Sequence, residues 1–140
     1  MNNTGFRKGI HIIADLWGCT CHPDKLKFSP HVRKIMKKCV KESGLTSLKN
    51  YFFQFEPVGV TGVYVLSQSH FSIHTWPEKN FASIDIFTCG PAEKALKAFE
   101  VLCNEFQPKR IEKKLLERMD EVNQIESIKT KNTLFTKKRK

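Results

Sequence analysis

The short connections in the middle of the chain constrain its fold more than any other sequence feature. Four segments rich in aromatic or β-branched residues follow one another closely, at residues 50–56, 60–66, 71–75 and 83–87. Only a few residues separate neighbouring segments, and they include Pro57, Gly59 and Pro77. A crossover between parallel strands needs about a dozen residues or more, so these connections favour hairpins. The sequence therefore predicts an antiparallel sheet in this region.

Two amphipathic helices and one further strand are predicted outside this region. Residues 31–43 have apolar side chains spaced three and four apart, with basic side chains on the other face, and Gly44 follows as a C-cap. Residues 92–106 show the same spacing, residues 9–17 predict a strand, and residues 109–119 fit either a helix or a strand. This order predicts an α+β fold, a single two-layer domain with an antiparallel β-sheet and two helices packed on one face.

Length and charge indicate one folded domain followed by a basic tail. The chain has 140 residues, the size of an ordinary domain, and its formal net charge is +10. Residues 129–140 contain six Lys or Arg residues and no acidic residue. We expect a flexible N-terminus over residues 1–8, the folded domain over 9–118 and a disordered basic tail over 119–140. A basic tail alone is weak evidence for nucleic-acid binding, so no nucleic-acid partner is expected.

Cysteine usage and hydropathy indicate a cytoplasmic protein. The chain has five cysteines, an odd number that does not suggest a disulfide framework. Asp15 interrupts the apolar run 10–14, so the N-terminus lacks the apolar core of a secretory signal. No apolar run approaches the length of a membrane span, and no membrane association is expected. Free thiols in a reducing compartment follow from these observations.

Side chains that can carry chemistry are concentrated in residues 59–90. This stretch contains His70, His74 and the thiol of Cys89. A Cys–His pair can supply a nucleophile, but a lone cysteine at a strand end is more often part of the core. The two histidines lack a third ligand, and the run C-T-C-H at residues 19–22 lacks a partner cluster. No metal is therefore expected.

A longer motif in the same stretch resembles a known enzyme family. Residues 67–78 read S-Q-S-H-F-S-I-H-T-W-P-E, and residues 85–90 read D-I-F-T-C-G. The short prokaryotic S-adenosylmethionine decarboxylases carry the similar patterns S-E-S-H-x-x-I-H-T-W-P-E and D-x-F-T-C-G. Residues 55–63 (F-x-P-x-G-V-T-G-V) match that family too, as do G-x-H and A-D-x-x-x-C in residues 9–19. The resemblance extends over roughly residues 9–118.

The resemblance implies that the chain cuts itself and makes its own cofactor. Ser69 would attack the carbonyl of Gln68, and loss of the Ser69 α-proton would expel the Gln68 carboxylate. Hydrolysis would then leave a pyruvoyl group derived from Ser69. In the family, the residue at the position of His74 is the base that removes the α-proton. The residue at the position of Thr61 is a serine that holds the processing intermediate. Cys89 stands at the position of the general acid that reprotonates the substrate carbon after decarboxylation.

The resemblance also implies a substrate and an assembly. In the family, the residue at the position of Phe55 stacks on adenine, and the residue at the position of Glu78 binds the ribose hydroxyls. These roles imply a small amino-acid-type substrate, S-adenosylmethionine. The decarboxylated product would supply polyamine synthesis. The short members of this family form dimers with the active site near the subunit interface, and the resemblance implies the same assembly here. We therefore expect a homodimer of processed protomers.

Three departures from the family pattern leave alternatives open. Gln68 replaces the usual glutamate, Thr61 replaces a serine, and residues 79–81 read K-N-F where Y-G-Y is more usual. The scissile carbonyl and the hydroxyl are kept, but Lys79 adds a positive charge beside Glu78. One alternative is a decarboxylase of the same family that acts on ornithine or arginine. Another is an unprocessed, inactive paralogue that acts as a regulatory partner.

Overall fold

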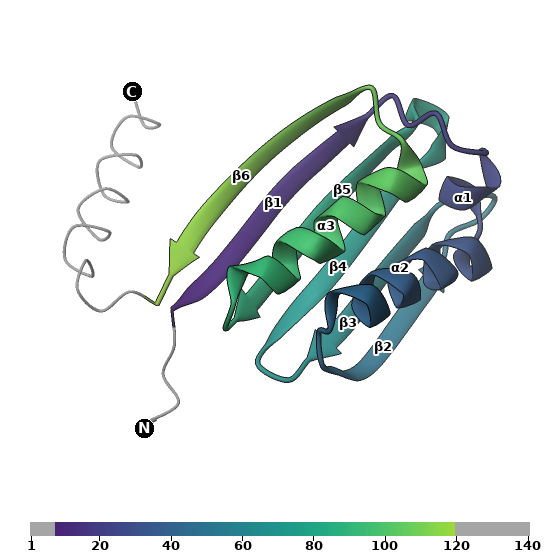
Figure 1. The fold of residues 1–140 in the computed structure, drawn as a ribbon. Coiled ribbons are helices and arrows are strands. Elements are labelled where there is room, and N and C mark those ends of the chain that lie inside the picture. Colours follow the sequence, from purple (N-terminus) through teal and green to yellow (C-terminus); the bar gives the residue numbers. More distant parts are fainter. Residues whose placement is uncertain (1–7, 120–140) are drawn as a thin grey trace, which may run out of the picture.

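The chain folds into one antiparallel sheet that is covered by helices on one face (Figure 1). The structure is a computed structural model, and it describes residues 8–119. Its elements in chain order are β1 (Gly9–Trp17), α1 (Asp24–Lys27), α2 (Ser29–Ser43), β2 (Ser47–Gln54), β3 (Val60–Leu66), β4 (Ser69–Trp76), η1 (Pro77–Lys79), β5 (Phe81–Cys89), α3 (Ala92–Phe106) and β6 (Arg110–Arg118). The arrangement confirms the predicted α+β fold. The short helices α1 and η1 were not predicted, because each begins beside a proline that suggested a break.

The strand order explains how distant parts of the sequence meet. The sheet has the order β2-β3-β4-β5-β1-β6, and its neighbouring strands are antiparallel. Strands β2 to β5 are consecutive hairpins, as their short connections predict. Strand β1 is inserted between β5 and β6. Residues 110–118 form a strand rather than a helix, and pairing with β1 satisfies their backbone groups on one side.

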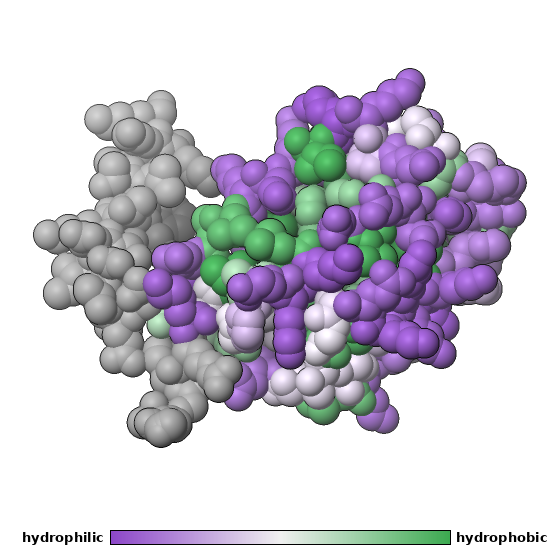
Figure 2. Space-filling model, viewed as in Figure 1, coloured by the Kyte–Doolittle hydropathy of each residue, from purple (hydrophilic) through white to green (hydrophobic). Residues whose placement is uncertain are grey.

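The hydrophobic core lies between the sheet and the helices. Alternate residues of the central strands point toward the helices and are almost completely buried, among them Ile12, Leu16, Phe71, Ile73, Ile84 and Ile86. The buried faces of α2 and α3 complete the core with side chains that include Val32, Met36, Cys39, Ala98, Leu102 and Phe106. The outward surface of this layer is mainly hydrophilic in Figure 2, and α2 exposes Lys34, Lys37, Lys38 and Lys41 there. Both helices are therefore stabilised mostly by packing of one apolar face.

The opposite face of the sheet carries no helix within the described residues (Figure 1). Six large apolar side chains point from this open face and are 39% to 65% exposed, namely Ile13, Tyr51, Phe53, Val65, Trp76 and Leu116. Their strands also present polar side chains on this face, in alternation with the buried core residues. Single exposed apolar residues are ordinary, but a broad apolar patch marks an interaction surface. The open face is therefore a candidate interface.

The predictions for the chain ends concern residues that the structure describes only in part. Residues 1–7 and 120–140 lie outside the described range, so the domain boundaries and the disordered basic tail stay predictions. Within residues 8–119, no helix is long and apolar enough to cross a membrane.

Candidate active site

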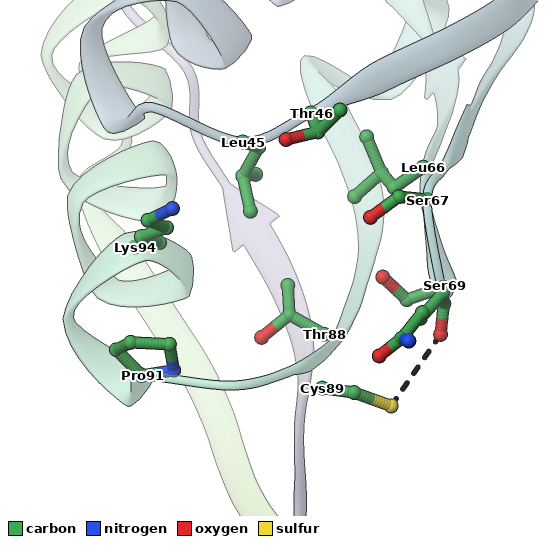
Figure 3. A pocket seen from close by; sticks show the side chains of 10 residues that line it. Leu45, Thr46, Leu66, Ser67, Ser69, Thr88, Cys89, Pro91 and Lys94 are labelled. Atoms are coloured by element: carbon green, nitrogen blue, oxygen red, sulfur yellow. Dashed lines mark hydrogen bonds between the residues drawn. The ribbon is translucent and has the colours of Figure 1, made fainter. Parts of the chain in front are cut away.

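The turn between β3 and β4 contains the bond that the sequence predicts to be cut. Leu66 pairs with Ser69, which leaves Ser67 and Gln68 as the turn and makes Ser69 the first residue of β4. Strand β5 pairs with the other side of β4 and brings Cys89 to the same end. The Cys89 thiol donates a hydrogen bond to the Gln68 carbonyl oxygen, with Sγ and O 3.4 Å apart (Figure 3). The carbonyl of the predicted scissile bond thus faces a proton donor.

A polar cavity of about 340 Å³ opens beside this turn. Its lining residues are Leu45, Thr46, Leu66, Ser67, Gln68, Ser69, Thr88, Cys89, Pro91 and Lys94 (Figure 3). Lys94 is the only charged residue among them, and no Asp or Glu is present. The cavity therefore has an excess of positive charge and several hydroxyl groups.

A second group of predicted site residues lies toward the other end of β4. Thr61 on β3 pairs with His74 on β4, and Thr61 Oγ1 lies 3.0 Å from His74 Nδ1. Phe55 and Glu78 line the same cavity of about 370 Å³ as this pair. Phe55 was predicted to lie within a strand over residues 50–56, but β2 ends at Gln54 and Phe55 lies in the loop that follows. The second cavity is therefore lined by the expected base, by the residue expected to hold the intermediate and by the two residues expected to bind substrate.

Strand β4 separates these two groups within one protomer. Ser69 and His74 are five positions apart on the strand, which corresponds to about 17 Å at the rise of an extended chain. The His74 ring cannot span that distance to reach the Ser69 α-proton. The structure brings together Gln68, Ser69 and Cys89 in one group, and Phe55, Thr61, His74 and Glu78 in another.

Two polar residues that the sequence analysis did not single out hold the second cavity in shape. The Gln54 side-chain amide donates hydrogen bonds to the backbone oxygens of Lys27 and Gly59, at 2.9 and 3.0 Å. The buried Thr75 hydroxyl donates to the backbone oxygen of Leu26 at 2.7 Å. These bonds connect the loop after β2 and the end of β4 to the segment around α1. Their partners are far away in sequence, so no local pattern could have revealed them.

The open face also carries a row of hydrogen-bonded polar groups that received no role from the sequence. Arg118 Nη1 lies 3.2 Å from His11 Nδ1, and His11 Nε2 lies 2.9 Å from Asp85 Oδ1. A guanidinium can only donate, so His11 Nδ1 accepts and the Nε2–H donates to Asp85. Burial, together with the neighbouring His11, lowers the pKa of His70 and so favours the neutral ring. The alternation along β1 could have placed His11 on this face, but not its partners.

Burial makes four of the five thiols poor nucleophiles. It raises the pKa of Cys19 and of Cys39 to about 12 and the pKa of Cys103 to about 11. Burial also raises the pKa of Cys21. All five cysteines are free, and within residues 8–119 no three His, Cys, Asp or Glu side chains are grouped to hold a metal ion.

We expect a brief treatment with iodoacetamide at neutral pH to label Cys89 before the other cysteines. Cys89 lines an open cavity, whereas partial or complete burial raises the pKa of the other four thiols, and the thiolate is the form that reacts. Peptide mass mapping over time measures the order of labelling. Cys89→Ser should remove the early label and Cys103→Ser should leave it unchanged. Simultaneous labelling of Cys89 and Cys103 would contradict this expectation.

Comparisons with known proteins identify relatives over most of the chain. The family model described as S-adenosylmethionine decarboxylase matches residues 10–119. An S-adenosylmethionine decarboxylase proenzyme of Persephonella marina is 47% identical over 110 residues, which are 79% of this chain and 81% of that protein. A proenzyme of the same description from Aquifex aeolicus is 40% identical over 130 residues, 91% of this chain and 95% of that protein.

The fold leads to the same relatives. The crystal structure of the adenosylmethionine decarboxylase from Aquifex aeolicus matches with a TM-score of 0.76 and 41% sequence identity. The match covers 80% of this chain and 91% of that chain. The resemblance seen in the motifs is therefore confirmed, and the chain belongs to the S-adenosylmethionine decarboxylase family.

Proposed function

We propose that this chain is a self-processing, pyruvoyl-dependent decarboxylase that acts on S-adenosylmethionine. The observation that carries the proposal is the 3.4 Å contact between the Cys89 thiol and the Gln68 carbonyl oxygen, directly before Ser69. It joins the bond that would be cut to the group that would later protonate the product. Membership of the family supports the same function.

Self-cleavage would begin with attack of the Ser69 hydroxyl on the Gln68 carbonyl carbon. The new C–O bond replaces the C–N bond, the Ser69 nitrogen takes up a proton, and the peptide becomes an ester. The hydrogen bond from Cys89 polarises the carbonyl and stabilises the charge that develops on its oxygen. Removal of the Ser69 α-proton then forms a Cα–Cβ double bond, and the Gln68 carboxylate leaves with the electron pair of the Cβ–O bond. Hydrolysis of the remaining enamine releases ammonia and leaves the pyruvoyl group.

The surroundings of Ser69 are compatible with a reactive group at the start of β4. Ser69 pairs with Leu66 on β3, and the next residue, His70, pairs with Phe87 on β5. These ladders would keep the new N-terminus fixed after the cut. A ketone-type carbonyl at this position would supply the electron sink that decarboxylation needs. Cys89, at the end of the neighbouring strand, would deliver a proton to the substrate carbon after carbon dioxide leaves.

We expect the purified protein to consist of two chains, residues 1–68 and residues 69–140, with the second blocked by pyruvoyl. Denaturing mass spectrometry on fresh and aged samples measures this. Ser69→Ala should give one uncut chain, because the attacking hydroxyl is missing. Cys89→Ala should still be cut, but up to about tenfold more slowly, because the carbonyl loses one neutral hydrogen bond. An uncut wild-type chain that persists for days would contradict self-processing and favour the inactive paralogue.

The separation of the two residue groups supports a homodimer with shared active sites. One protomer holds Ser69 and Cys89 about 17 Å from His74, so a single chain cannot bring His74, the expected base, to the Ser69 α-proton. Packed sheets lie about 10 Å apart, a gap that side chains from both sheets can fill. A second copy facing the open sheet could therefore supply the missing base.

A two-fold axis would provide this arrangement in a simple way. Consider an axis that lies between two facing sheets and crosses the strands near Ser72, in the middle of β4. Rotation about it places the Ser69 end of one strand over the His74 end of the other, and the contact is the same for both protomers. The exposed apolar side chains of the open face would be buried by the same contact. The same packing would thus complete two active sites and cover the exposed apolar side chains of the open face.

We expect subunit complementation between Ser69→Ala and His74→Ala chains. Each variant alone should lack activity, whereas a mixed dimer would contain one complete site, because Ser69 and His74 come from different protomers. With random pairing, co-expression should restore about a quarter of the wild-type sites. Decarboxylation assays and cleavage of the His74→Ala chain measure the effect.

A matched pair of variants serves as the control for complementation. Ser69 and Cys89 belong to the same group, so Ser69→Ala and Cys89→Ala chains should not complement each other in turnover. If neither pair of variants complements, the shared active site is contradicted. Self-cleavage would then be tested only by the mass spectrometry described above.

The second cavity suits an adenosyl group. The Phe55 ring is 47% exposed and available for stacking, and Glu78 lines the same cavity. An aromatic face can stack on adenine and attract the sulfonium cation, while a carboxylate can accept hydrogen bonds from both ribose hydroxyls. Ornithine and arginine have neither an adenine nor a ribose. The pair therefore favours S-adenosylmethionine over these amino acids.

The unusual residues 79–81 form an ordered turn. Asn80 has φ 49°, a left-handed conformation that glycine adopts freely and asparagine tolerates. The Asn80 backbone oxygen accepts a hydrogen bond from the Cys19 N–H at 2.9 Å, and the Phe81 ring packs 4.3 Å from that of Trp17, centroid to centroid. Lys79 is exposed at the turn. The departure from the family pattern thus adds a surface charge at Lys79, and Glu78 lines the second cavity.

We expect carbon dioxide release from S-adenosylmethionine and none from ornithine or arginine, assayed in parallel. Glu78→Gln should weaken substrate binding, because a charge-assisted hydrogen bond worth roughly 1.5–3 kcal/mol is lost, about ten- to a hundredfold in kcat/KM. Lys79→Tyr, which restores the more usual family residue, should change kcat/KM little. Release from ornithine or arginine alone would overturn the substrate and leave the cleavage chemistry standing.

A further inference from the structure

The hydroxyl of Thr88 is an unusual feature of the cavity beside the cleavage turn. Thr88 is 4% exposed, and its Oγ1 is the only buried side-chain nitrogen or oxygen in residues 8–119 without a hydrogen-bond partner. The residue lines the cavity, and Figure 3 shows its hydroxyl on the side that faces Pro91. Buried polar groups in native proteins nearly always have a partner, so this one indicates a group still to be bound.

The same cavity is prepared for a negative charge. Helix α3 begins at Ala92 after Pro91, and no side chain caps its first turn, so free N–H groups and the positive end of the helix dipole lie there. Lys94 lines the cavity and forms no ion pair with another described residue. Figure 3 shows its ammonium on the cavity side of α3. The acidic residue of this turn, Glu93, is exposed and not part of the lining.

We propose that this cavity binds the C-terminal carboxylate of Gln68 that self-cleavage creates, through the Thr88 hydroxyl, the Lys94 ammonium and the start of α3. This inference rests on the proposed function, because only a cut chain has that carboxylate. Gln68 already lines the cavity before the cut. The Ser67 N–H donates to the Thr46 backbone oxygen at 3.0 Å, a bond that cleavage leaves in place. The chain is thus held at Ser67, and only Gln68 becomes free to turn into the cavity.

Moving the carboxylate away would prepare Cys89 for turnover. In the uncut chain, the Cys89 thiol is engaged with the Gln68 carbonyl oxygen. A carboxylate left in that place would retain the thiol proton in a stronger, charge-assisted hydrogen bond. It would also occupy the space next to the new N-terminus of β4. Capture by Thr88 and Lys94 therefore frees the thiol to protonate the substrate.

Thermal unfolding of matched cut and uncut proteins tests the proposal. Thr88→Val and Lys94→Met are introduced into the self-cleaving chain and into Ser69→Ala, which stays uncut. In the cut protein each variant should lower Tm by roughly 3–6 °C, because a bound carboxylate loses a partner. In the uncut protein Thr88→Val should leave Tm unchanged or raise it, because an unpaired buried hydroxyl is removed. Lys97→Met, on the exposed ion pair with Glu100 of the same helix, is the control and should not distinguish cut from uncut.

Carbon-13 NMR provides a second readout that does not depend on activity. With ¹³C-carbonyl glutamine, cleavage converts one labelled carbonyl into a carboxylate that can be titrated. Its pKa should lie below the usual value of about 3.3–3.7 for an α-carboxyl group, and Lys94→Met should raise it toward that value. A normal pKa that Lys94→Met does not change, or equal Tm effects in cut and uncut proteins, would overturn the proposal.

The outcomes separate this inference from the function on which it rests. If mass spectrometry finds only uncut wild-type chain, self-cleavage itself fails. If the chain is cut but the variants act equally in both backgrounds, only the carboxylate site fails. Calorimetric titration with acetate and phosphate tests the alternative that the cavity binds a free anion. Binding to uncut Ser69→Ala but not to the cut protein supports occupation by the chain's own carboxylate, and equal binding to both overturns it.

Discussion

The pairing of β4 with two strands at once is the constraint on which the rest of the site depends. The ladder with β3 leaves Ser67 and Gln68 as the turn, and the ladder with β5 carries Cys89 to the same end. A slip of one residue in either ladder would send the buried alternate residues, such as Phe71 and Ile73, to the open face. The core thus fixes the register, and the register sets the 3.4 Å contact between the thiol and the carbonyl. The geometry of the turn is thus a consequence of packing in the core between the sheet and the helices.

The sequence predicted the elements that depend on short connections between neighbouring segments or on a simple period of apolar residues. The hairpins from β2 to β5 followed from short connections, and α2 and α3 from one apolar face each. Strand β6 could not be predicted in this way. Its residues are good helix formers and all are exposed, so neither periodicity nor burial decides between helix and strand. Its conformation depends on β1 at the other end of the chain, and such non-local pairing overrides helix propensity.

The sequence motif indicated the residues of the candidate site, but only part of their arrangement could be predicted. The motif presents Ser69 and His74 only five positions apart, which suggests one compact site. In an extended strand the same spacing corresponds to about 17 Å, so the period alone was enough to predict their separation. Spacing cannot identify the surface that would close the gap in the proposed dimer. We infer that surface from the open face, where Phe53 and Trp76 are exposed. Thr88 illustrates a different limit, because its unpaired hydroxyl becomes visible only when burial and partners are known.

The strand order also explains how the protein could survive a cut in its own backbone. Residues 8–68 contain β1, α1, α2, β2 and β3, and residues 69–119 contain β4, η1, β5, α3 and β6. In the sheet these two sets interleave, because β1 from the first lies between β5 and β6 from the second. Three ladders, β3–β4, β5–β1 and β1–β6, would therefore hold the pieces together without the peptide bond. Since Cys89 reaches Gln68 only when these ladders exist, its help in the proposed cleavage would require that the chain folds first.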